Sequence, residues 1–424
     1  MSKKLVVIGV LCLALVLAVM PLAGACAPKA QSPEPEQFIK IGMMNPSTGK
    51  AAEKGLPMMN ANNDVIKYIN AERPVAGKYK IDATVLDSNY DPTKVVTIVN
   101  GFMTSGDVLF TTAASAEMSP AKTAANEAGF PGISCFSAPS LYRPPAHIYG
   151  QTPDYGDDAV TFVNYYLQNI WKGTGKPKVA LLMLNNPTGY GARDAFKAVG
   201  DQLGIEVVSM DEHAATTTSE IDTLTRIKGL NPDVLYISST PQPASVIIKN
   251  AKELGMYPGV TIGCCHAAMT SALISLGGAD VVEGVYGVYP TVSWGADVPG
   301  MAKMTEYCQN LHPDWYQKSN MDYIVSWAQG LIVAKALELA VQNAGYDVVA
   351  KGDAAAWQAV ETQGIQKLQN YDVEGLQGPV SYTPGDNRLD KSNRVFQITG
   401  GKITQLTDWV EAPLIKYEQF DWFK

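Results

Sequence analysis

The pattern of apolar and polar residues along the chain predicts an alternation of strands and helices. Short runs rich in β-branched residues predict strands, and longer stretches with an apolar face predict helices. The predicted strands are Phe38–Met44, Tyr79–Leu86, Val108–Phe110, Gly132–Ser134, Val179–Leu184, Ile205–Met210, Val234–Ser238, Val260–Ile262 and Gly284–Tyr289. The predicted helices are Asn60–Asn70, one that starts at Asp91-Pro92, Pro120–Ala128, Val160–Trp171, Ala192–Leu203, Ile221–Ile227, Ala244–Leu254 and Met321–Ala344. Such an alternation forms βαβ units around parallel sheets.

The alternation stops near residue 150 and then starts again, which predicts two lobes. We therefore expect an α/β fold with two doubly wound, Rossmann-like lobes. The end of the chain differs, because Val380–Tyr382, Val395–Ile398 and Lys402–Gln405 are strand candidates without helices between them. Gly400-Gly401 supplies a hairpin turn between the last two.

The first 25 residues have the pattern of a secretory signal. Two lysines, Lys3 and Lys4, precede an apolar run of 16 residues, Leu5–Met20. That run is shorter than the roughly 20 residues that a membrane-spanning helix needs, and small residues follow it, as at a signal-peptidase site. Cys26 comes directly after them, and the junction resembles a bacterial lipobox, in which this cysteine carries the lipid. The alternative is an ordinary secretory signal with an incidental cysteine.

Residues 26–37 predict a spacer between the anchor and the folded part. The stretch 27–37 (APKAQSPEPEQ) holds three prolines and no large apolar side chain, so it cannot bury a core. No later segment is apolar enough to be predicted as a membrane span. A lipid on Cys26 would therefore be the only attachment to a membrane.

Composition indicates a well-packed globular protein with an acidic surface. Of the 424 residues, 46% are hydrophobic and 17% are charged. The net charge is −8, and it becomes −10 once the signal leaves with its two lysines. This excess of acid argues against a nucleic-acid partner, because phosphate contacts need clustered Lys and Arg.

The cysteines do not predict a disulfide framework. Cys12 leaves with the signal and Cys26 is the predicted anchor, which leaves four scattered thiols in a large chain. These four are Cys135, Cys264, Cys265 and Cys308. A bridge from Cys264 or Cys265 to Cys308 and a set of buried free thiols are both open alternatives.

The loops that follow the predicted strands are the expected ligand site. Ligands bind beyond the carboxyl ends of the strands in open parallel sheets. The loops are 45–55, 111–119, 135–143, 185–191, 239–243 and 263–268, and they are rich in Ser, Thr, Asn and Gly. Three tyrosines, Tyr142, Tyr155 and Tyr190, lie in or near them. Hydroxyls and backbone amides beside aromatic walls suit a small polar ligand with an apolar part.

Seven segments in order resemble one family. They are IKIGMMNPSTGKAAEKG, LDSNYDPTKVV, NEAGFPGIS, NPTGYGARDAF, LNPDVLYIS, EGVYGVYP and LQGPVSYTPGDNR. From about residue 38 to about residue 410 the chain is similar to the type I periplasmic solute-binding proteins, in particular the branched-chain amino acid binding group. The resemblance implies two lobes joined by a three-crossover hinge. One lobe would comprise 38–150 plus 287–375, and the other 151–286 plus 376–424.

The resemblance also implies a function. A monomer would trap a small solute between its lobes outside the cytoplasm and deliver it to the permease of an ATP-driven importer. We expect no enzymatic activity, no cofactor and no metal. One alternative is a sensory receptor of the same fold. The other is a surface-tethered hydrolase, for which the chain lacks a G-x-S-x-G nucleophile elbow.

The family's ligand-binding positions are carried over one residue at a time. The hydroxyl that holds the ligand carboxylate falls on Ser115, and the next loop contributes Ser137 and Ala138. The aromatic wall of the second lobe falls on Tyr190, and a second aromatic position falls on Thr240. The last two positions are an aromatic residue and the acid that pairs with the ligand ammonium, and they fall on Lys54 and Cys265. The family's usual disulfide positions fall on Tyr90 and Ala114.

The changes at Lys54 and Cys265 predict a different ligand. An ammonium buried without a counter-charge costs several kcal/mol, and a neutral thiol cannot supply that charge. We therefore expect a neutral or anionic solute, such as an aromatic or aliphatic carboxylate, in place of an α-amino acid. The alternatives are an alignment that slips by one residue, or a replacement acid at Glu117, Asp154 or Glu283.

Two other motifs suggest different chemistry. Gly189-Tyr190-Gly191 with Asp211 is a partial dinucleotide fingerprint, but Asp194 stands where the third glycine belongs. Cys264-Cys265-His266 suggests a metal or thiol site, but adjacent donors on an extended loop point alternately and no second cluster completes a zinc set. We expect neither function, and we expect Cys265 to line the cleft.

Overall fold

The computed structural model describes residues 36–316 and 320–423. The chain divides into a unit that ends at Gln37 and a large unit, Phe38–Lys424, whose fold is described below. Cys26, the predicted signal at 1–25 and nearly all of the predicted spacer lie outside the described residues.

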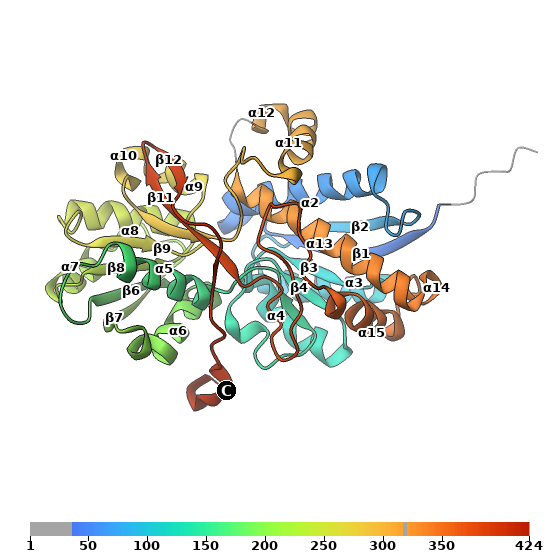
Figure 1. The fold of residues 1–424 in the computed structure, drawn as a ribbon, viewed down its shortest axis with the longest axis horizontal. Coiled ribbons are helices and arrows are strands. Elements are labelled where there is room, and N and C mark those ends of the chain that lie inside the picture. Colours follow the sequence, from blue (N-terminus) through green and yellow to red (C-terminus); the bar gives the residue numbers. More distant parts are fainter. Residues whose placement is uncertain (1–35, 317–319, 424) are drawn as a thin grey trace, which may run out of the picture. The chain divides into compact units, whose positions relative to one another are not determined.

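The first sheet contains five parallel strands in the order β2-β1-β3-β4-β5. The strands are β1 (Phe38–Asn45), β2 (Lys80–Asp87), β3 (Phe110–Thr112), β4 (Gly132–Ser134) and β5 (Ile148–Gly150). The main helices around it are α2 (Ala52–Glu72), α3 (Pro92–Ser105), α4 (Ser115–Ala128), α13 (Met321–Ala344) and α15 (Ala354–Gln363), with the single turn α14 (Tyr346–Val349) between the last two. In Figure 1 this lobe combines the blue and cyan elements with the orange helices from much later in the chain.

The second sheet follows the order β12-β11-β10-β9-β8-β6-β7, with β13 paired to β11. Its strands are β6 (Lys178–Leu184), β7 (Glu206–His213), β8 (Val234–Ser238), β9 (Thr261–Cys264), β10 (Tyr286–Tyr289), β11 (Ser392–Thr399), β12 (Lys402–Gln405) and β13 (Val410–Glu411). Its helices are α5 (Tyr155–Asn169), α6 (Pro187–Leu203), α7 (Ile221–Gly229), α8 (Pro241–Glu253), α9 (Ser271–Gly277) and α10 (Ala279–Val282). The strands from β7 to β10 are parallel, and the antiparallel hairpin β11–β12 extends them as predicted.

The chain crosses between the sheets three times. It leaves the first sheet between β5 and α5, and it returns between β10 and α11 (Pro299–Leu311), which packs on α2. The third crossing leads into β11. The predicted fold class is confirmed. The residue boundaries of the lobes stay a prediction, and the boundary placed between residues 286 and 287 falls inside β10.

Proline and polar caps set the starts of several helices. The predicted start at Asp91-Pro92 is confirmed, since the Asp91 carboxylate accepts the N–H of Thr93 at 2.8 Å. The same rule applies to α6 and α8, which begin at Pro187 and Pro241 and therefore start earlier than predicted. The strand predicted at 380–382 is wrong, because only an isolated bridge joins Val380 to Tyr371.

Helix α13 forms the centre of the first lobe. Its predicted bounds are confirmed, and most of its residues are buried, including Trp327 and Tyr323 at 0% exposure. Among the described residues it is the one helix long and apolar enough to span a membrane, so the expectation that no later segment is that apolar is wrong, but 78% of its apolar window is buried in the protein. Its composition therefore reflects the core that it fills.

A buried network of charges joins the first and third crossings. Backbone hydrogen bonds hold the segments side by side, from Gly150 N–H to Asn387 O and from Leu389 N–H to Gly150 O. The Arg388 side chain is 1% exposed. It donates at 2.8 Å to Asp157, near the start of α5, and at 2.9 Å to Asp386. The hinge is therefore tied to the second lobe by ion pairs without solvent screening.

Arg388→Met should lower the free energy of unfolding by about 3–5 kcal/mol, because it leaves Asp157 and Asp386 buried with less counter-charge. Urea denaturation would measure the change. The control is Arg226→Met, which removes a solvent-exposed partner of Asp211 and should leave stability close to wild type. Equal losses in both variants would contradict this account.

Candidate functional site

A cavity of about 20 Å³ lies where the loops after the strands of both sheets meet. Its walls come from the start of α2, the loops after β3 and β4, the first residues of α5 and α6, and the loops after β8 and β9. The lining residues are Pro46, Ala51, Lys54, Met58, Tyr90, Ala113, Ala114, Phe136, Tyr155, Thr188, Thr240 and Ala267. This is the position that the carboxyl ends of parallel strands predict for a ligand site.

Two of the predicted site residues, Lys54 and Thr240, line this cavity together. Lys54 is only 6% exposed and comes from the first turn of α2. Thr240 is the residue that precedes α8. The two positions that the family fills with aromatic residues thus face the same space from opposite lobes.

The other predicted residues lie in the same loops without lining the cavity. The Ser115 hydroxyl donates to the Phe136 carbonyl at 3.3 Å, and the Ser137 hydroxyl donates to the Ser134 carbonyl at 3.4 Å. Ala138 is buried just before a short 3₁₀ helix. The hydroxyl protons of Ser115 and Ser137 are therefore engaged by backbone carbonyls of the protein itself.

Tyr190 and Cys265 face elsewhere. Tyr190 is partly exposed and stacks with the Arg193 guanidinium at 4.1 Å. The buried Cys265 thiol donates to the Ser239 carbonyl at 3.4 Å, and burial raises its pKa to about 11. Cys265 is not among the residues that line this cavity, whereas Ala267, two residues later, is.

Phe136, Tyr155, Thr188 and Tyr90 line the cavity although they were not among the predicted site residues. Phe136 precedes Ser137 by one residue, so the side chain that faces the cavity is one position earlier than the alignment placed it. Tyr155 is one of the three tyrosines that the sequence places in or near the loops after the strands. Tyr90 stands at one of the family's disulfide positions, where its ring forms part of the cavity wall.

Lys54 forms a buried ion pair. Its Nζ lies 2.5 Å from Asp322 Oδ1, and the two side chains are 7% and 0% exposed. The Tyr289 hydroxyl donates to the same carboxylate oxygen at 2.8 Å. The ammonium also lies 4.8 Å from the centre of the Phe136 ring, within the range of a cation–π interaction. Asp322, on the first turn of α13, is therefore the counter-charge of Lys54, and the sequence analysis does not predict this pairing.

Three aromatic rings stack across the two lobes beside this pair. The His266 ring lies between Phe136 and Tyr155, with 4.5 Å between ring centres on each side. His266 Nδ1 lies 2.7 Å from Asp158 Oδ2, and neither ring nitrogen makes a directed hydrogen bond. The backbone N–H of His266 donates to the same carboxylate at 2.9 Å. The stack packs the loop after β9 against the first lobe.

The three acids proposed as replacements serve other purposes. Glu117 is fully buried, and its carboxyl group accepts the N–H of Ala113 at 3.0 Å and of Ala114 at 3.1 Å. Asp154 caps α5 and accepts the Tyr142 hydroxyl at 2.8 Å. Glu283 accepts the N–H of Gly400 at 3.1 Å. None of the three lines the cavity.

The cysteines and the Cys264-Cys265-His266 motif are buried in the protein. The cysteines at 135, 264, 265 and 308 are free and buried, which is the second of the two alternatives left open by the sequence. Burial raises the pKa of the Cys264 and Cys265 thiols, which disfavours the thiolate. Within residues 36–316 and 320–423 there is no cluster of three or more His, Cys, Asp or Glu side chains that could hold a metal ion.

Packing explains the glycines of the partial dinucleotide fingerprint. A Cβ on Gly189 would collide with the backbone of Leu184 at the end of β6. A Cβ on Gly191 would lie 2.7 Å from the Cβ of Tyr155. Asp211 pairs with Arg226 at 2.7 Å. The glycines therefore let α6 approach its strand and the start of α5.

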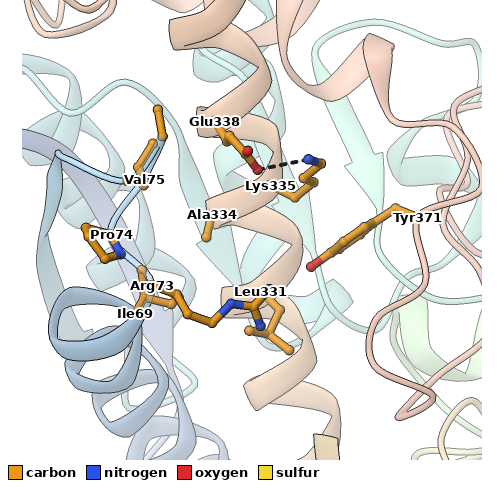
Figure 2. Close-up of a pocket in the computed structure, with 11 residues that line it drawn as sticks. Ile69, Arg73, Pro74, Val75, Leu331, Ala334, Lys335, Glu338 and Tyr371 are labelled. Carbon is orange, nitrogen blue, oxygen red and sulfur yellow. Dashed lines mark hydrogen bonds and ion pairs between the residues drawn. The ribbon is translucent and has the colours of Figure 1, made fainter. Parts of the chain in front are cut away.

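Another pocket, of about 220 Å³, is lined by the end of α2, residues 73–77, α13 and Tyr371. Figure 2 shows Tyr371 pointing toward it, opposite Arg73, with Lys335 and Glu338 on the α13 side. Lys335 pairs with Glu338 at 2.9 Å, and Arg73 pairs with Glu374. Because its lining residues come from the end of α2, residues 73–77, α13 and Tyr371, and not from the loops that follow the strands, this pocket is a weaker candidate than the central cavity.

A model of the family described as periplasmic binding protein matches residues 38–402. The chain belongs to this family. Members are binding proteins that act outside the cytoplasm, and membership therefore supports solute binding as the general role. A search of curated proteins found no match.

Solved structures share the fold of this periplasmic binding protein. A branched-chain amino acid ABC transporter protein from Thermus thermophilus with bound valine is 18% identical, with a TM-score of 0.78 over 91% of this chain and 99% of that chain. A fatty acid ABC transporter substrate-binding protein from Thermomonospora curvata is 20% identical, with a TM-score of 0.75 over 91% and 94%. A branched-chain amino acid binding protein from Streptococcus pneumoniae in complex with isoleucine is 18% identical, with a TM-score of 0.70 over 88% and 100%.

Glu117→Gln should remove a pH dependence of stability. Burial raises the pKa of Glu117 from 4.5 to about 8, so the folded protein retains a proton that the unfolded chain loses. Between these two values the free energy of unfolding should fall with rising pH, by up to about 1.4 kcal/mol per pH unit. Urea denaturation from pH 5 to pH 8 should show a flatter profile for Glu117→Gln. Glu127→Gln, on the exposed side of the same helix, should keep the wild-type slope.

Proposed function

We propose that this protein is the extracytoplasmic solute receptor of an ATP-driven importer, and that its solute lacks an α-ammonium group. The solute is an apolar carboxylate, or a neutral compound with a carbonyl at the same place. It lies between the lobes, and closure of the hinge holds it there.

The charges around the central cavity carry this proposal. None of the twelve lining residues has a carboxylate, and Lys54 is the single charged side chain among them. The acids at 117, 154 and 283 are all engaged by other groups. A ligand ammonium would have to be buried beside a lysine, at a cost of several kcal/mol.

Lys54 can still serve a ligand oxygen. Its ammonium has three N–H donors, and Asp322 accepts one of them at 2.5 Å. Because Asp322 neutralises the pair, a neutral carbonyl is acceptable to the site as well as a carboxylate. The Thr188 and Thr240 side chains also lie in the cavity wall. They are the short hydroxyl groups that orient a ligand in such sites.

Solved structures of this fold include proteins for both kinds of ligand. One protein of this fold has bound valine, another isoleucine, and a third is a fatty acid transport protein. The fold therefore accommodates ligands with and without an ammonium group. For this chain, the positive charge of Lys54 and the lack of a carboxylate among the lining residues favour a ligand without an ammonium group.

Cys26 completes the proposal. A lipid on this residue, followed by the proline-rich spacer, would keep a monomeric binder close to its permease without a membrane-spanning helix. The attachment rests on the sequence of the junction at residues 23–26 and on the composition of residues 27–37.

Isothermal titration with three matched compounds tests the proposed ligand class. The compounds are leucine, 4-methylpentanoate, which is leucine without its amino group, and the neutral 4-methylpentanamide. We expect the carboxylate to bind at least tenfold more tightly than leucine, because leucine must bury its ammonium beside Lys54 in a cavity whose lining residues offer no carboxylate. Leucine binding as tightly as 4-methylpentanoate would contradict the proposal.

A charge-neutral double variant is the control. Lys54→Met with Asp322→Asn removes both charges of the buried pair, so no uncompensated charge remains at the position. The variant should lose any preference for the carboxylate over the amide. A preference that persists would show that another group holds the carboxylate.

A further inference from the structure

His266 separates two aromatic walls of the central cavity. Its ring lies between the rings of Phe136 and Tyr155, with 4.5 Å between ring centres and 29° between ring planes on each side. Phe136 follows β4 of the first sheet, Tyr155 is the first residue of α5, and both line the cavity. The distance between these two walls therefore depends on the side chain at position 266.

Stacking is the main contribution of the His266 side chain. It is 0% exposed, and within the described part of the chain neither of its ring nitrogens makes a directed hydrogen bond. A buried polar atom without such a bond is costly, so hydrogen bonding of the nitrogens does not explain an imidazole at this place. Aromatic rings whose centres lie 4.5 Å apart attract each other, and His266 makes two such contacts.

Asp158 holds the ring in this place. Its Oδ2 lies 2.7 Å from His266 Nδ1, and it accepts the backbone N–H of His266 at 2.9 Å. Its Oδ1 accepts the side-chain amide of Asn393 at 2.9 Å. Asp158 belongs to the first turn of α5, and Asn393 belongs to β11. The position of the imidazole is therefore fixed by the helix after the first crossing and by the strand after the third.

The stack also touches the charged pair of the site. The Lys54 ammonium lies 4.8 Å from the centre of the Phe136 ring. Tyr289, which donates to Asp322, meets the Phe136 ring edge-on at 6.1 Å and the His266 ring at 6.5 Å. A displacement of Phe136 would therefore change the surroundings of Lys54 as well as the width of the cavity.

We propose that His266 is a positioning residue that determines which side chain of a solute the site accepts. Its ring is a spacer between Phe136 and Tyr155, and because it fills the gap between them, an aromatic ring of the solute cannot enter that gap. The site therefore favours solutes with an aliphatic side chain over those with an aryl ring. The inference rests on the proposed role of the central cavity as the solute site, and it applies to either head group.

Isothermal titration of wild type and His266→Ala with two matched pairs is the first test. One pair is 4-methylpentanoate and 3-phenylpropanoate, and the other is leucine and phenylalanine. Within each pair the head group is the same, so the ratio of the two affinities reports on the side chain alone. In His266→Ala this ratio should shift toward the aromatic member by about fivefold or more, because its ring can stack between Phe136 and Tyr155. A general loss of structure would weaken both members equally, and an unchanged ratio would overturn the proposal.

The conservative variant is His266→Phe combined with Asp158→Asn. It keeps a ring between the two walls, and it leaves no buried carboxylate without its partner. Because the spacer is present, this double variant should restore the wild-type preference for the aliphatic member of each pair. A ratio that shifts as far as in His266→Ala would show that the contact with Asp158, and not the ring, determines the preference, and would contradict the proposal.

The two pairs keep this proposal distinguishable from the proposed function. If leucine binds more tightly than 4-methylpentanoate, the proposed head group is wrong, while the shift toward phenylalanine in His266→Ala still supports the spacer.

Small-angle X-ray scattering without added solute decides the matter if none of the four compounds binds. The stack joins the loop after β4 of the first sheet to the loop after β9 of the second. His266→Ala should therefore have a larger radius of gyration than wild type, and the double variant should return to the wild-type value. Equal radii for all three proteins would overturn the spacer role.

Discussion

The pair of Lys54 and Asp322 determines what the space between the lobes can hold. Both side chains are removed from water and lie 2.5 Å apart. Each charge would be costly alone, so the pair fixes the start of α2 against the start of α13. Tyr289, at the end of β10, donates to the same carboxylate, so the second sheet contributes to the arrangement. The electrostatic character of the cavity follows from this contact.

A second constraint comes from Glu117, which acts on the loop after β3. Its carboxyl group accepts the N–H groups of Ala113 and Ala114, which are residues of the cavity wall. The N–H donors that would suit a ligand carboxylate at this loop are thus already satisfied from within. The remaining strong donor at the cavity is the Lys54 ammonium. The ligand oxygen and the lysine are therefore expected to meet, although the family's usual position for that oxygen is at Ser115.

Local sequence determined much of the fold in advance. The alternation of strands and helices predicted both sheets, and Met321–Ala344 was predicted with its bounds, because periodicity and length are local properties. The helix starts at Pro187 and Pro241 were missed, since apolar periodicity begins only after the first helical turn. The wall of the cavity was less accessible to prediction. Asp322 is 268 residues from Lys54, and no pattern along the chain links them.

The sequence also could not predict which side chains of the loops face the cavity. An error of one residue in the loop after β4 exchanges Phe136 for Ser137, and it changes an aromatic wall into a hydroxyl. In the loop after β9, Cys265 turns to the Ser239 carbonyl while Ala267 faces the cavity. Loop side chains do not alternate with a fixed period, so which of them faces a ligand is decided by tertiary packing.

The central claim is that this chain holds a solute without an α-ammonium group beside a buried lysine. Mass spectrometry of small molecules released from the purified, denatured protein tests it most directly, because the cell itself then supplies the ligand. The account predicts an apolar monocarboxylate or a neutral carbonyl compound in near-stoichiometric amount. A free α-amino acid released in that amount would contradict it.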